Sequence, residues 1–443
     1  MEIITTYSVK IKHYNKIFKN TVVLYRQTVD FLINVCLEEW DSIQLIENIK
    51  FKKLYVEKLI HKTKQNQKVK YDFDKYFYKF PSYLRRSAIA EAMGKVSSYK
   101  SNYENWKLNK KGKEPGKPIA GNIYPCLYKG NVYKSTGTYT AKIKVFVRNT
   151  WDWLYLSLRK SDVDYILNHC SYREKKSPTL QKRGKEWYLD FPFKEYVKLN
   201  DTKIKDRRIL AVDLGVNTPA TISIMESDGT ILDRLFCKLP KEQDSLNHSI
   251  NRIKKAQKYG NKRMPRLWAK VNGINKDISV KTAQFIIDVA TLYDVDVIVF
   301  EYLDRHNMKS KLKGKKKQKI HLWHSNEIQR IVADKAHRLG MRISRINAKY
   351  TSQLAYDGSG FVLRGKKGGH KSFELCTFQT GKIYNCDLSA SYNIGARYFI
   401  RELLKTFCES KRLQMEAKVP SLCRRSTCTL STLISLNAAM SSL

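Results

Sequence analysis

The segment Ile-Leu-Ala-Val-Asp-Leu-Gly at residues 209–215 decides the fold that we expect for the second half of the chain. Four apolar residues in succession are typical of a strand buried on both faces, and this strand would end at Asp213. The segment Asp-Val-Ile-Val-Phe-Glu at residues 296–301 repeats the pattern and ends at Glu301. We therefore expect two central strands that each carry an acid at the carboxyl end.

Other segments of this half alternate between strand and helix patterns. The dipeptide Asp228-Gly229 predicts a hairpin, because it supplies the positive φ that a tight turn needs. Further elements are expected at residues 221–224 and 231–232 (the hairpin strands), 241–292 and 323–339 (helices), 341–346 (a strand) and 389–404 (a helix). Antiparallel strands followed by strands that alternate with helices are typical of a ribonuclease-H-like α/β layer.

Three acids lie where such a sheet binds its ligands. Asp213 and Glu301 end the two apolar strands, and Asp387 opens the last helix. Ligands of open α/β sheets bind outside the carboxyl ends of the strands. Three carboxylates that met there would repel one another unless divalent cations neutralised them, and their oxygen atoms favour Mg²⁺ or Mn²⁺. Two such ions could orient a water molecule for attack on a phosphodiester, which is the chemistry of a nuclease.

Each acid also has an ordinary structural interpretation. Asp213 could simply end a strand, Glu301 could be a solvated strand end, and Asp387 could be a helix N-cap that accepts hydrogen bonds from backbone N–H groups. Taken singly, these interpretations compete with the metal-site hypothesis. The conjunction of the three acids with the charge of the chain favours the nuclease.

The charge of the chain indicates a nucleic-acid partner. Its 443 residues contain 83 Lys and Arg against 41 Asp and Glu, which gives a formal net charge of +42. Nucleic acid would neutralise this surplus, because contacts between basic side chains and phosphates release counterions. No apolar run approaches the roughly 18 residues of a membrane helix. Nine cysteines at irregular spacing predict no disulfide framework, so we expect a soluble intracellular protein with no membrane partner.

The first half of the chain has a different pattern. Alternation at residues 3–9 and strand patterns at residues 142–147 and 187–191 predict a small β-barrel. Helical patterns at residues 24–35 and 82–106 fall between these strands. A helical lobe would therefore interrupt the barrel.

Three motifs resemble those of the RuvC-type nuclease domain of TnpB proteins, which accompany bacterial insertion sequences and are similar to the miniature type V CRISPR effectors. These motifs are AVDLGVNTPATISI (211–224), VDVIVFEYLDRH (295–306) and YNCDLSASYNIGARY (384–398). The segment at residues 322–353 and several features of the N-terminal half are also similar. The resemblance thus covers about residues 1–400.

The resemblance implies a fold class of α/β plus α+β. The chain would be bilobed, with an N-terminal β-barrel (wedge) that carries a helical insertion, and a C-terminal RuvC/RNase-H-like domain that carries a degenerate zinc-ribbon insertion. The expected divisions are the wedge at residues 1–20 and 118–205, a helical recognition lobe at 21–117, the nuclease domain at 206–349 and 387–405, the ribbon insertion at 350–386, and a peripheral or disordered tail at 406–443.

Carried over by motif, the resemblance implies that Asp213, Glu301 and Asp387 are the catalytic and metal-binding triad. It implies a guide RNA that directs cleavage of complementary DNA, with double-stranded and single-stranded DNA as partners of a monomer or homodimer. The protein would be cytoplasmic in a bacterium and associated with the nucleoid when bound to DNA. Two alternatives stay open: an RNA-guided DNA-binding repressor with weak or no nuclease activity, and a transposition-associated enzyme that transfers DNA strands.

The chain departs from the family in the insertion at residues 350–386. Family members usually carry a zinc ribbon there, built from two Cys-x-x-Cys pairs. The first pair is absent here, and the second would fall at Thr377 and Thr380, which are not soft ligands. Cys376 and Cys386 alone do not make a four-ligand site. We therefore expect no zinc and a metal-free loop that is held by aromatic and apolar side chains.

Two basic clusters are expected to contact nucleic acid. One lies on a helix that would follow an RNA backbone. The other is a lysine-rich loop that would grip a strand beside the acids, with a merely solvated loop as the alternative. The expected nucleic-acid-binding residues are Lys254, Lys255, Lys258, Lys262, Arg263, Lys311, Lys313, Lys315, Lys316 and Lys317.

Overall fold

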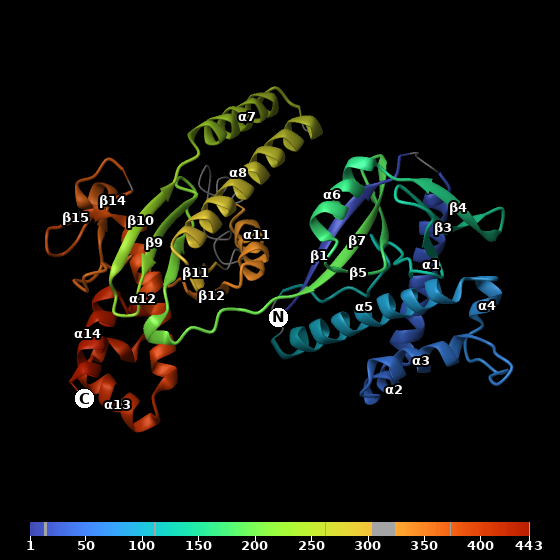
Figure 1. Cartoon of the computed structure of the whole chain (residues 1–443), viewed down its shortest axis with the longest axis horizontal. Helices are drawn as coiled ribbons and strands as arrows, with labels where there is room; N and C mark the ends of the chain where they lie inside the picture. Colours follow the sequence, from blue (N-terminus) through green and yellow to red (C-terminus); the bar gives the residue numbers. More distant parts are fainter. Residues whose placement is uncertain (13–15, 110–111, 262, 304–323, 373, 443) are drawn as a thin grey trace. The chain divides into compact units, whose positions relative to one another are not determined.

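The computed structural model describes residues 1–443 except residues 13–15, 110–111, 262, 304–323, 373 and 443 and the side chain of residue 366. The chain divides into two compact units (Figure 1). One unit is Glu2–Tyr196, and the other is Val197–Leu443 together with Met1. In the part of the chain that the structure describes, no helix combines the length and the apolar character needed to cross a membrane.

The first unit contains two antiparallel sheets instead of the expected closed β-barrel. In one sheet, β7 (Glu186–Tyr196) pairs with β1 (Glu2–Lys10), β5 (Glu174–Lys175) and β6 (Thr179–Arg183). The other sheet has the order β2-β3-β4, with the strands Tyr133–Ser135, Thr140–Val147 and Thr150–Ser157. Among the described strands, the sheets approach at an isolated bridge between Ile11 and Leu158. This bridge is a single residue pair, so the ladder does not close.

The helices of this unit share one core with the two sheets. They are α1 (Ile17–Glu38), α2 (Trp40–Leu45), α3 (Ile49–Ile60), α4 (Phe73–Tyr76), α5 (Ser82–Asn109) and α6 (Lys160–Cys170). α1 packs against both α5 and β3. Its buried residues Phe18, Val22, Tyr25 and Val29 recur every three or four positions, which is the spacing of one helix face. The helical insertion expected between the strands is therefore confirmed.

The second unit is built on a five-stranded mixed sheet with the order β10-β9-β8-β11-β12. The strands are β8 (Ile209–Asp213), β9 (Ala220–Met225), β10 (Ile231–Cys237), β11 (Val297–Tyr302) and β12 (Arg342–Asn347). β9 is antiparallel to both β8 and β10, whereas β11 is parallel to both β8 and β12. The expected hairpin joins β9 to β10, and Gly229 in its turn has a φ of 97°.

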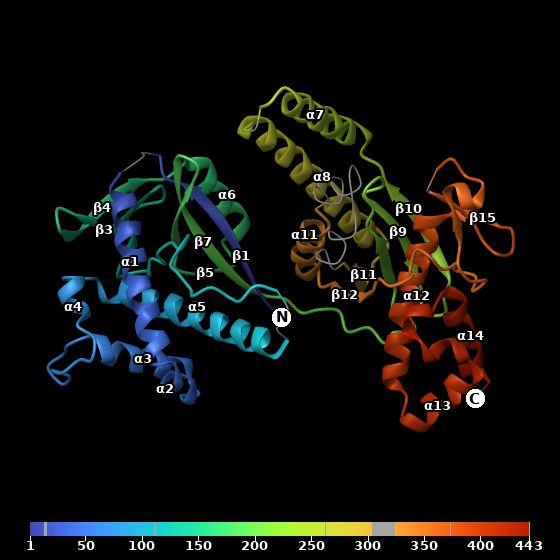
Figure 2. The same cartoon turned by 180° about the vertical axis from the view of Figure 1, so that it is seen from behind.

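Helices cover both faces of this sheet (Figures 1 and 2). Leu210 and Val212 of β8 share a core with α8 and α11, whereas Ile209 and Ala211 share a core with α12 and α14. This alternation explains the continuous apolar run, because both faces of the strand are covered. The helices are α7 (Pro240–Lys258), α8 (Pro265–Leu292), α11 (Ser325–Arg338), α12 (Cys386–Thr406), α13 (Glu409–Lys418) and α14 (Leu430–Ser441), with short 3-10 turns at Ile204–Asp206, Gly365–Gly368, Pro420–Cys423 and Arg425–Thr427.

A glycine allows α12 to lie close to the sheet. A Cβ atom at Gly395 would be 2.8 Å from Cε of Met225 and 3.3 Å from Cβ of Ala211. A larger residue would therefore push the helix away from β8 and β9. Because Asp387 lies on α12, this close approach fixes the distance of that acid from the sheet.

The segment expected to be a peripheral or disordered tail is folded, which corrects that expectation. It forms α13 and α14, and α14 packs against α12. Leu430, Leu433 and Leu436 of α14 are buried in the core that contains α12. Their three-residue spacing gives the helix an apolar face, and burial of this face stabilises the tail on the second unit.

Candidate active site

Asp213 and Glu301 lie at the carboxyl ends of two neighbouring parallel strands. β8 and β11 pair in the register that aligns Val212 with Phe300, so the two acids take the next position on adjacent strands. Asp387 lies in the first turn of α12, and this helix packs against β8. The fold brings the three acids to one edge of the sheet, which we call the acidic edge (Asp213, Glu301 and Asp387).

The three acids interact electrostatically. The pKa of the Asp213 carboxyl is raised well above its ordinary value, first by burial and then by the negative charges of Glu301 and Asp387. The positive charge of Arg364 acts in the opposite direction. Since one carboxyl group feels the charges of both others, the three groups share one electrostatic environment.

Burial also raises the pKa of the other two acids. Glu301 is 8% exposed, and the hydrogen bond from Thr351 and the charge of Arg397 lower its pKa again in part. Asp387 is half-buried, and the charge of Arg364 lowers its pKa against the effect of burial. Carboxyl groups in such a site gain stability by binding either protons or a cation.

The ordinary structural interpretations of two acids do not hold. The N-cap of α12 is Asn385, whose Oδ1 accepts hydrogen bonds from the backbone N–H groups of Asp387 (2.9 Å) and Leu388 (3.0 Å). The carboxylate of Asp387 is therefore not the cap. Glu301 is buried, so it is not a solvated strand end.

A loop residue that the sequence did not single out holds the side chain of Glu301. The hydroxyl group of Thr351, which is 2% exposed, hydrogen-bonds Oε1 of Glu301. Nε2 of Gln329 donates to the backbone carbonyl of Glu301 at 3.0 Å, and Nε of Arg345 donates to Oε1 of Gln329 at 2.9 Å. Both the side chain and the backbone of this acid are thus fixed by polar partners.

Helix α12 fixes the loop that carries Thr351. Nδ2 of Asn393 donates to the backbone carbonyl of Thr351 at 3.0 Å. One turn later, Nη1 of Arg397 donates to the carbonyls of Asn347 (3.0 Å) and Lys349 (2.8 Å). Asn393 and Arg397 are spaced by four, so they lie on one face of the helix, and this spacing was the signal in the sequence that could have revealed the contact.

Arg364 of β13 (Leu363–Arg364) brings a positive charge to the acidic edge. This charge lowers the pKa of both Asp213 and Asp387. Its Nε and Nη2 atoms are buried and have no hydrogen-bond partner within the described ranges of the chain. Guanidinium N–H groups are strong donors to anionic oxygens. Arg364 can therefore donate to an anion that is bound beside the acids.

The acidic edge fits a divalent cation in its chemistry. Its donors are carboxylate oxygens, which are the ligands of Mg²⁺ and Mn²⁺, and the mutual repulsion of the acids is the effect that a cation would relieve. As the side chains stand, no group of three or more His, Cys, Asp or Glu residues is placed to hold a metal ion among the described residues. The donor set is therefore present, but it is not assembled as a coordination group.

The segment at residues 350–386, which we expected to be a degenerate ribbon, contains a small sheet with its own core. β13, β14 (Leu375–Thr377) and β15 (Ile383–Asn385) form three antiparallel strands. Cys376 and Cys386 are buried with Ala355 and Phe378, and aromatic rings pack around them. Both thiols thus contribute to apolar packing in this insertion.

The expected basic residues are only partly described. Lys255 and Lys258 are exposed and Lys254 is half-buried on α7, and Arg263 is exposed after the helix. The remaining residues of the prediction, Lys262, Lys311, Lys313, Lys315, Lys316 and Lys317, lie outside the described residues. The α7 residues thus form a basic surface, whereas the lysine-rich loop stays a prediction.

Solved structures show similarity in fold. The mini-RNA-guided endonuclease CRISPR-Cas_phi3 aligns with a TM-score of 0.55 and 11% identity, over 89% of this chain and 92% of that chain. Cas12f1 in its complex with sgRNA and target DNA aligns with a TM-score of 0.34 and 15% identity, over 88% of this chain and 98% of that chain. This protein is therefore a mixed α/β protein that is similar in fold to CRISPR-Cas_phi3.

Sequence relatives define the family. A family model described as the Aq_aa04 family matches residues 5–147. The TnpB-like protein aq_aa05 of Aquifex aeolicus (strain VF5) is 30% identical over 253 residues, which span 52% of this chain and 79% of that protein. The chain belongs to the TnpB-like protein family.

Proposed function

We propose that the protein is an RNA-guided DNA endonuclease that cleaves phosphodiester bonds at the acidic edge. The observation that carries this proposal is the convergence of Asp213, Glu301 and Asp387 from β8, β11 and α12. The TnpB-like family and a net charge of +42 support it, because both a guide RNA and a DNA target are polyanions. The strand order and the acids at the carboxyl ends of β8 and β11 support our interpretation of this sheet as the core of a RuvC/RNase-H-like domain.

In this proposal the nuclease domain is formed by residues 206–349 and 387–405, with the degenerate ribbon at 350–386 as an insertion. The wedge at residues 1–20 and 118–205 and the helical lobe at 21–117 would bind the guide and read the target. The exposed lysines of α7 would contact the nucleic-acid backbone.

The residues of the acidic edge would each have a defined part in the reaction. Asp213, Glu301 and Asp387 would hold two Mg²⁺ ions, which would supply activation of a water molecule and stabilisation of the leaving oxygen. Thr351 orients the Glu301 carboxylate and partly lowers the pKa that burial raises. The free N–H groups of Arg364 would donate to a phosphate oxygen of the strand.

The test starts with the RNA that copurifies with the protein. Sequencing this RNA defines the complementary DNA, which is then incubated with the ribonucleoprotein and Mg²⁺. We expect cleavage by the wild-type protein and no cleavage by Asp213→Ala, Glu301→Ala or Asp387→Ala, each of which should retain RNA binding. The matched control is Asp244→Ala, an exposed acid of α7, which should cleave like the wild type. Cleavage by any of the three edge variants would refute the assignment of the triad.

A second candidate is an RNA-guided DNA-binding repressor with weak or no nuclease activity. The observation that favours it is the loss of both Cys-x-x-Cys pairs from the segment at residues 350–386. The same experiment separates the two functions. Retention of target DNA by the ribonucleoprotein with no product in Mg²⁺ or Mn²⁺ would support the repressor.

A further inference from the structure

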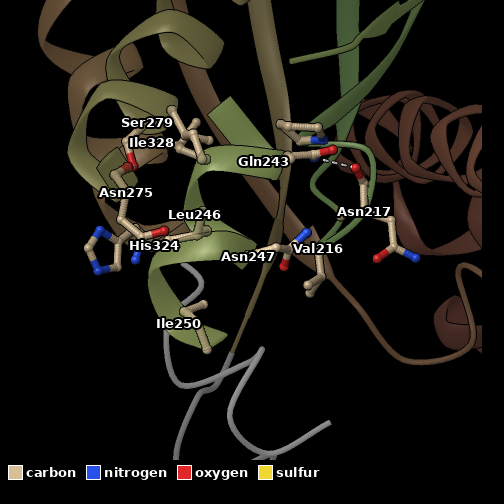
Figure 3. A pocket seen from close by; sticks show the side chains of 13 residues that line it. Val216, Asn217, Gln243, Leu246, Asn247, Ile250, Asn275, Ser279, His324 and Ile328 are labelled. Carbon is tan, nitrogen blue, oxygen red and sulfur yellow. Dashed lines mark hydrogen bonds between the residues drawn. The ribbon is translucent and has the colours of Figure 1, made fainter. Parts of the chain in front are cut away.

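A pocket of about 110 Å³ opens between the segment after β8 and the helices α7, α8 and α11 (Figure 3). One part of its wall is the segment after β8, where Gly215 and Val216 follow Asp213 by two and three residues. The other parts are side chains of α7 and α8 and of the start of α11. A ligand in this pocket would therefore contact the segment that directly follows Asp213.

The lining of the pocket is apolar and neutral. Val216, Leu246, Ile250, Ile278 and Ile328 supply apolar surface. The polar side chains among the lining residues include the amides of Asn and Gln, and no Asp, Glu, Lys or Arg is among them. His324 is the one titratable side chain among the lining residues, so a phosphate or another charged ligand would find no permanently charged partner here. A flat, neutral group with hydrogen-bonding edges matches such a wall, and these are the properties of a nucleobase.

Asn275 provides a buried donor that needs an acceptor. It is 6% exposed, and its Nδ2 has no hydrogen-bond partner in the described part of the chain. An unsatisfied buried donor is unfavourable, so an acceptor that enters the pocket gains from this group. By contrast, the amide of Gln243 already donates to the carbonyl oxygen of Asn217 at 2.5 Å, as Figure 3 shows. Asn275 is thus the group that would recognise the ligand.

The volume of the pocket suits a ligand with a single six-membered ring. A cavity of roughly 150 Å³ binds benzene, so about 110 Å³ suits one six-membered ring better than two fused rings. The carbonyl oxygens of a pyrimidine are acceptors for the amide of Asn275. We propose that the pocket binds one pyrimidine base, unstacked from the DNA strand next to the scissile phosphate. This inference rests on the proposed nuclease function.

Cleavage of a substituted target series tests the proposal. The DNA is complementary to the copurifying RNA, and each position around the cut carries thymine, cytosine, a purine or an abasic unit in turn. At one position we expect pyrimidines to be cleaved about tenfold faster than the abasic unit or a purine, in line with one buried hydrogen bond and one packed ring. Asn275→Leu should reduce this preference several-fold. Equal rates at every position, or a preference that Asn275→Leu retains, would overturn the proposal.

The control variant is Asn272→Leu, which makes the same change one turn earlier on an exposed face of α8. It should keep the base preference of the wild type. If neither protein cleaves any DNA, the proposed function has failed, and the pocket is tested by photocrosslinking of the full ribonucleoprotein in EDTA to a target that carries 5-iodouracil. Crosslinks to peptides of α7, α8 or His324 would support the pocket. Crosslinks that occur only outside these segments would overturn the proposed base-binding pocket.

Discussion

The hydroxyl group of Thr351 hydrogen-bonds the carboxylate of Glu301, although Thr351 lies in the loop after β12 and Glu301 lies in β11. This bond lowers the pKa that burial raises. The backbone carbonyl of Thr351 also accepts a hydrogen bond of 3.0 Å from Asn393, which is on the helix that carries Asp387. One loop residue is therefore connected to the elements of two acids, and a change at this residue should affect both.

Thr351→Val should slow DNA cleavage by about 10- to 100-fold, the usual cost of removing a partner that orients a ligand. Without the hydroxyl donor, the pKa of Glu301 rises further. The carboxylate is then ionised only at higher pH, so the acid limb of the pH–rate profile should move to higher pH. Single-turnover rates measured across pH in Mg²⁺ check this prediction. Thr351→Ser keeps the hydroxyl group and should restore the profile, whereas superimposable profiles for Val and wild type would contradict the assigned role.

Arg364→Ala should reduce cleavage by about a hundredfold, because the variant lacks the guanidinium N–H donors that we propose bind a phosphate oxygen. Loss of its charge also raises the pKa of Asp213 and Asp387 and removes a positive charge that repels a bound cation, so Mg²⁺ should bind at a lower concentration. Cleavage rates at increasing Mg²⁺ separate these effects, because loss of the donors lowers the maximal rate, whereas tighter cation binding lowers the midpoint of the Mg²⁺ dependence. Lys367→Ala removes an exposed charge from the same insertion and should leave rate and midpoint unchanged. A wild-type rate for Arg364→Ala would rule out its participation.

Leu433→Ala should destabilise the second unit by about 2–5 kcal/mol, because Leu433 of α14 is fully buried in the core that α14 shares with α12. The neighbouring residue Ile434 is 52% exposed, so Ile434→Ala should cost less than about 0.5 kcal/mol. Unfolding in urea, followed by circular dichroism, measures both. Equal stability of the two variants would mean that the tail does not pack on α12 in solution.

The central strands and the acids could be predicted from the sequence because their signal is local. Four apolar residues before Asp213 and before Glu301 identify strands buried on both faces, and the Asp228-Gly229 turn identifies the hairpin. The convergence of the acids then follows from the rule for open sheets. For these features, neighbouring residues carry most of the information.

The rest depends on contacts between distant segments. The N-cap of α12 is Asn385 and not Asp387, a difference of two residues that only the backbone conformation decides. The contacts of Thr351 depend on how its loop meets the Glu301 strand. The helices of the C-terminal tail were not predicted, because its many Ser and Thr residues suggested a polar segment. Leu430 and Leu433 nevertheless lie on one helix face. Barrel closure likewise depends on whether separate ladders join, which no local pattern encodes.

The acidic edge should make the stability of the metal-free protein depend on pH. The pKa of Asp213 in the folded protein is raised above its ordinary value of 3.8, so the folded state favours the protonated form. The stability from this group is present below the unfolded pKa and is lost as the pH rises through the folded pKa. At neutral pH in EDTA, the raised pKa of Asp213 should therefore cost the wild type stability that Asp213→Asn keeps.

Asp213→Asn should be more stable than the wild type at neutral pH in EDTA, because the variant has no carboxyl group to ionise in this buried site. The difference should shrink on acidification, because both proteins are then neutral at this position. Mg²⁺ should raise the unfolding temperature of the wild type more than that of the variant, since only the wild type keeps all three carboxylates. Thermal unfolding across pH, with and without Mg²⁺, measures all three effects, and Asp244→Asn on the exposed face of α7 is the control. A variant that is less stable than the wild type at neutral pH in EDTA would show that Asp213 is not under charge repulsion, which would remove the electrostatic argument for a cation at this edge.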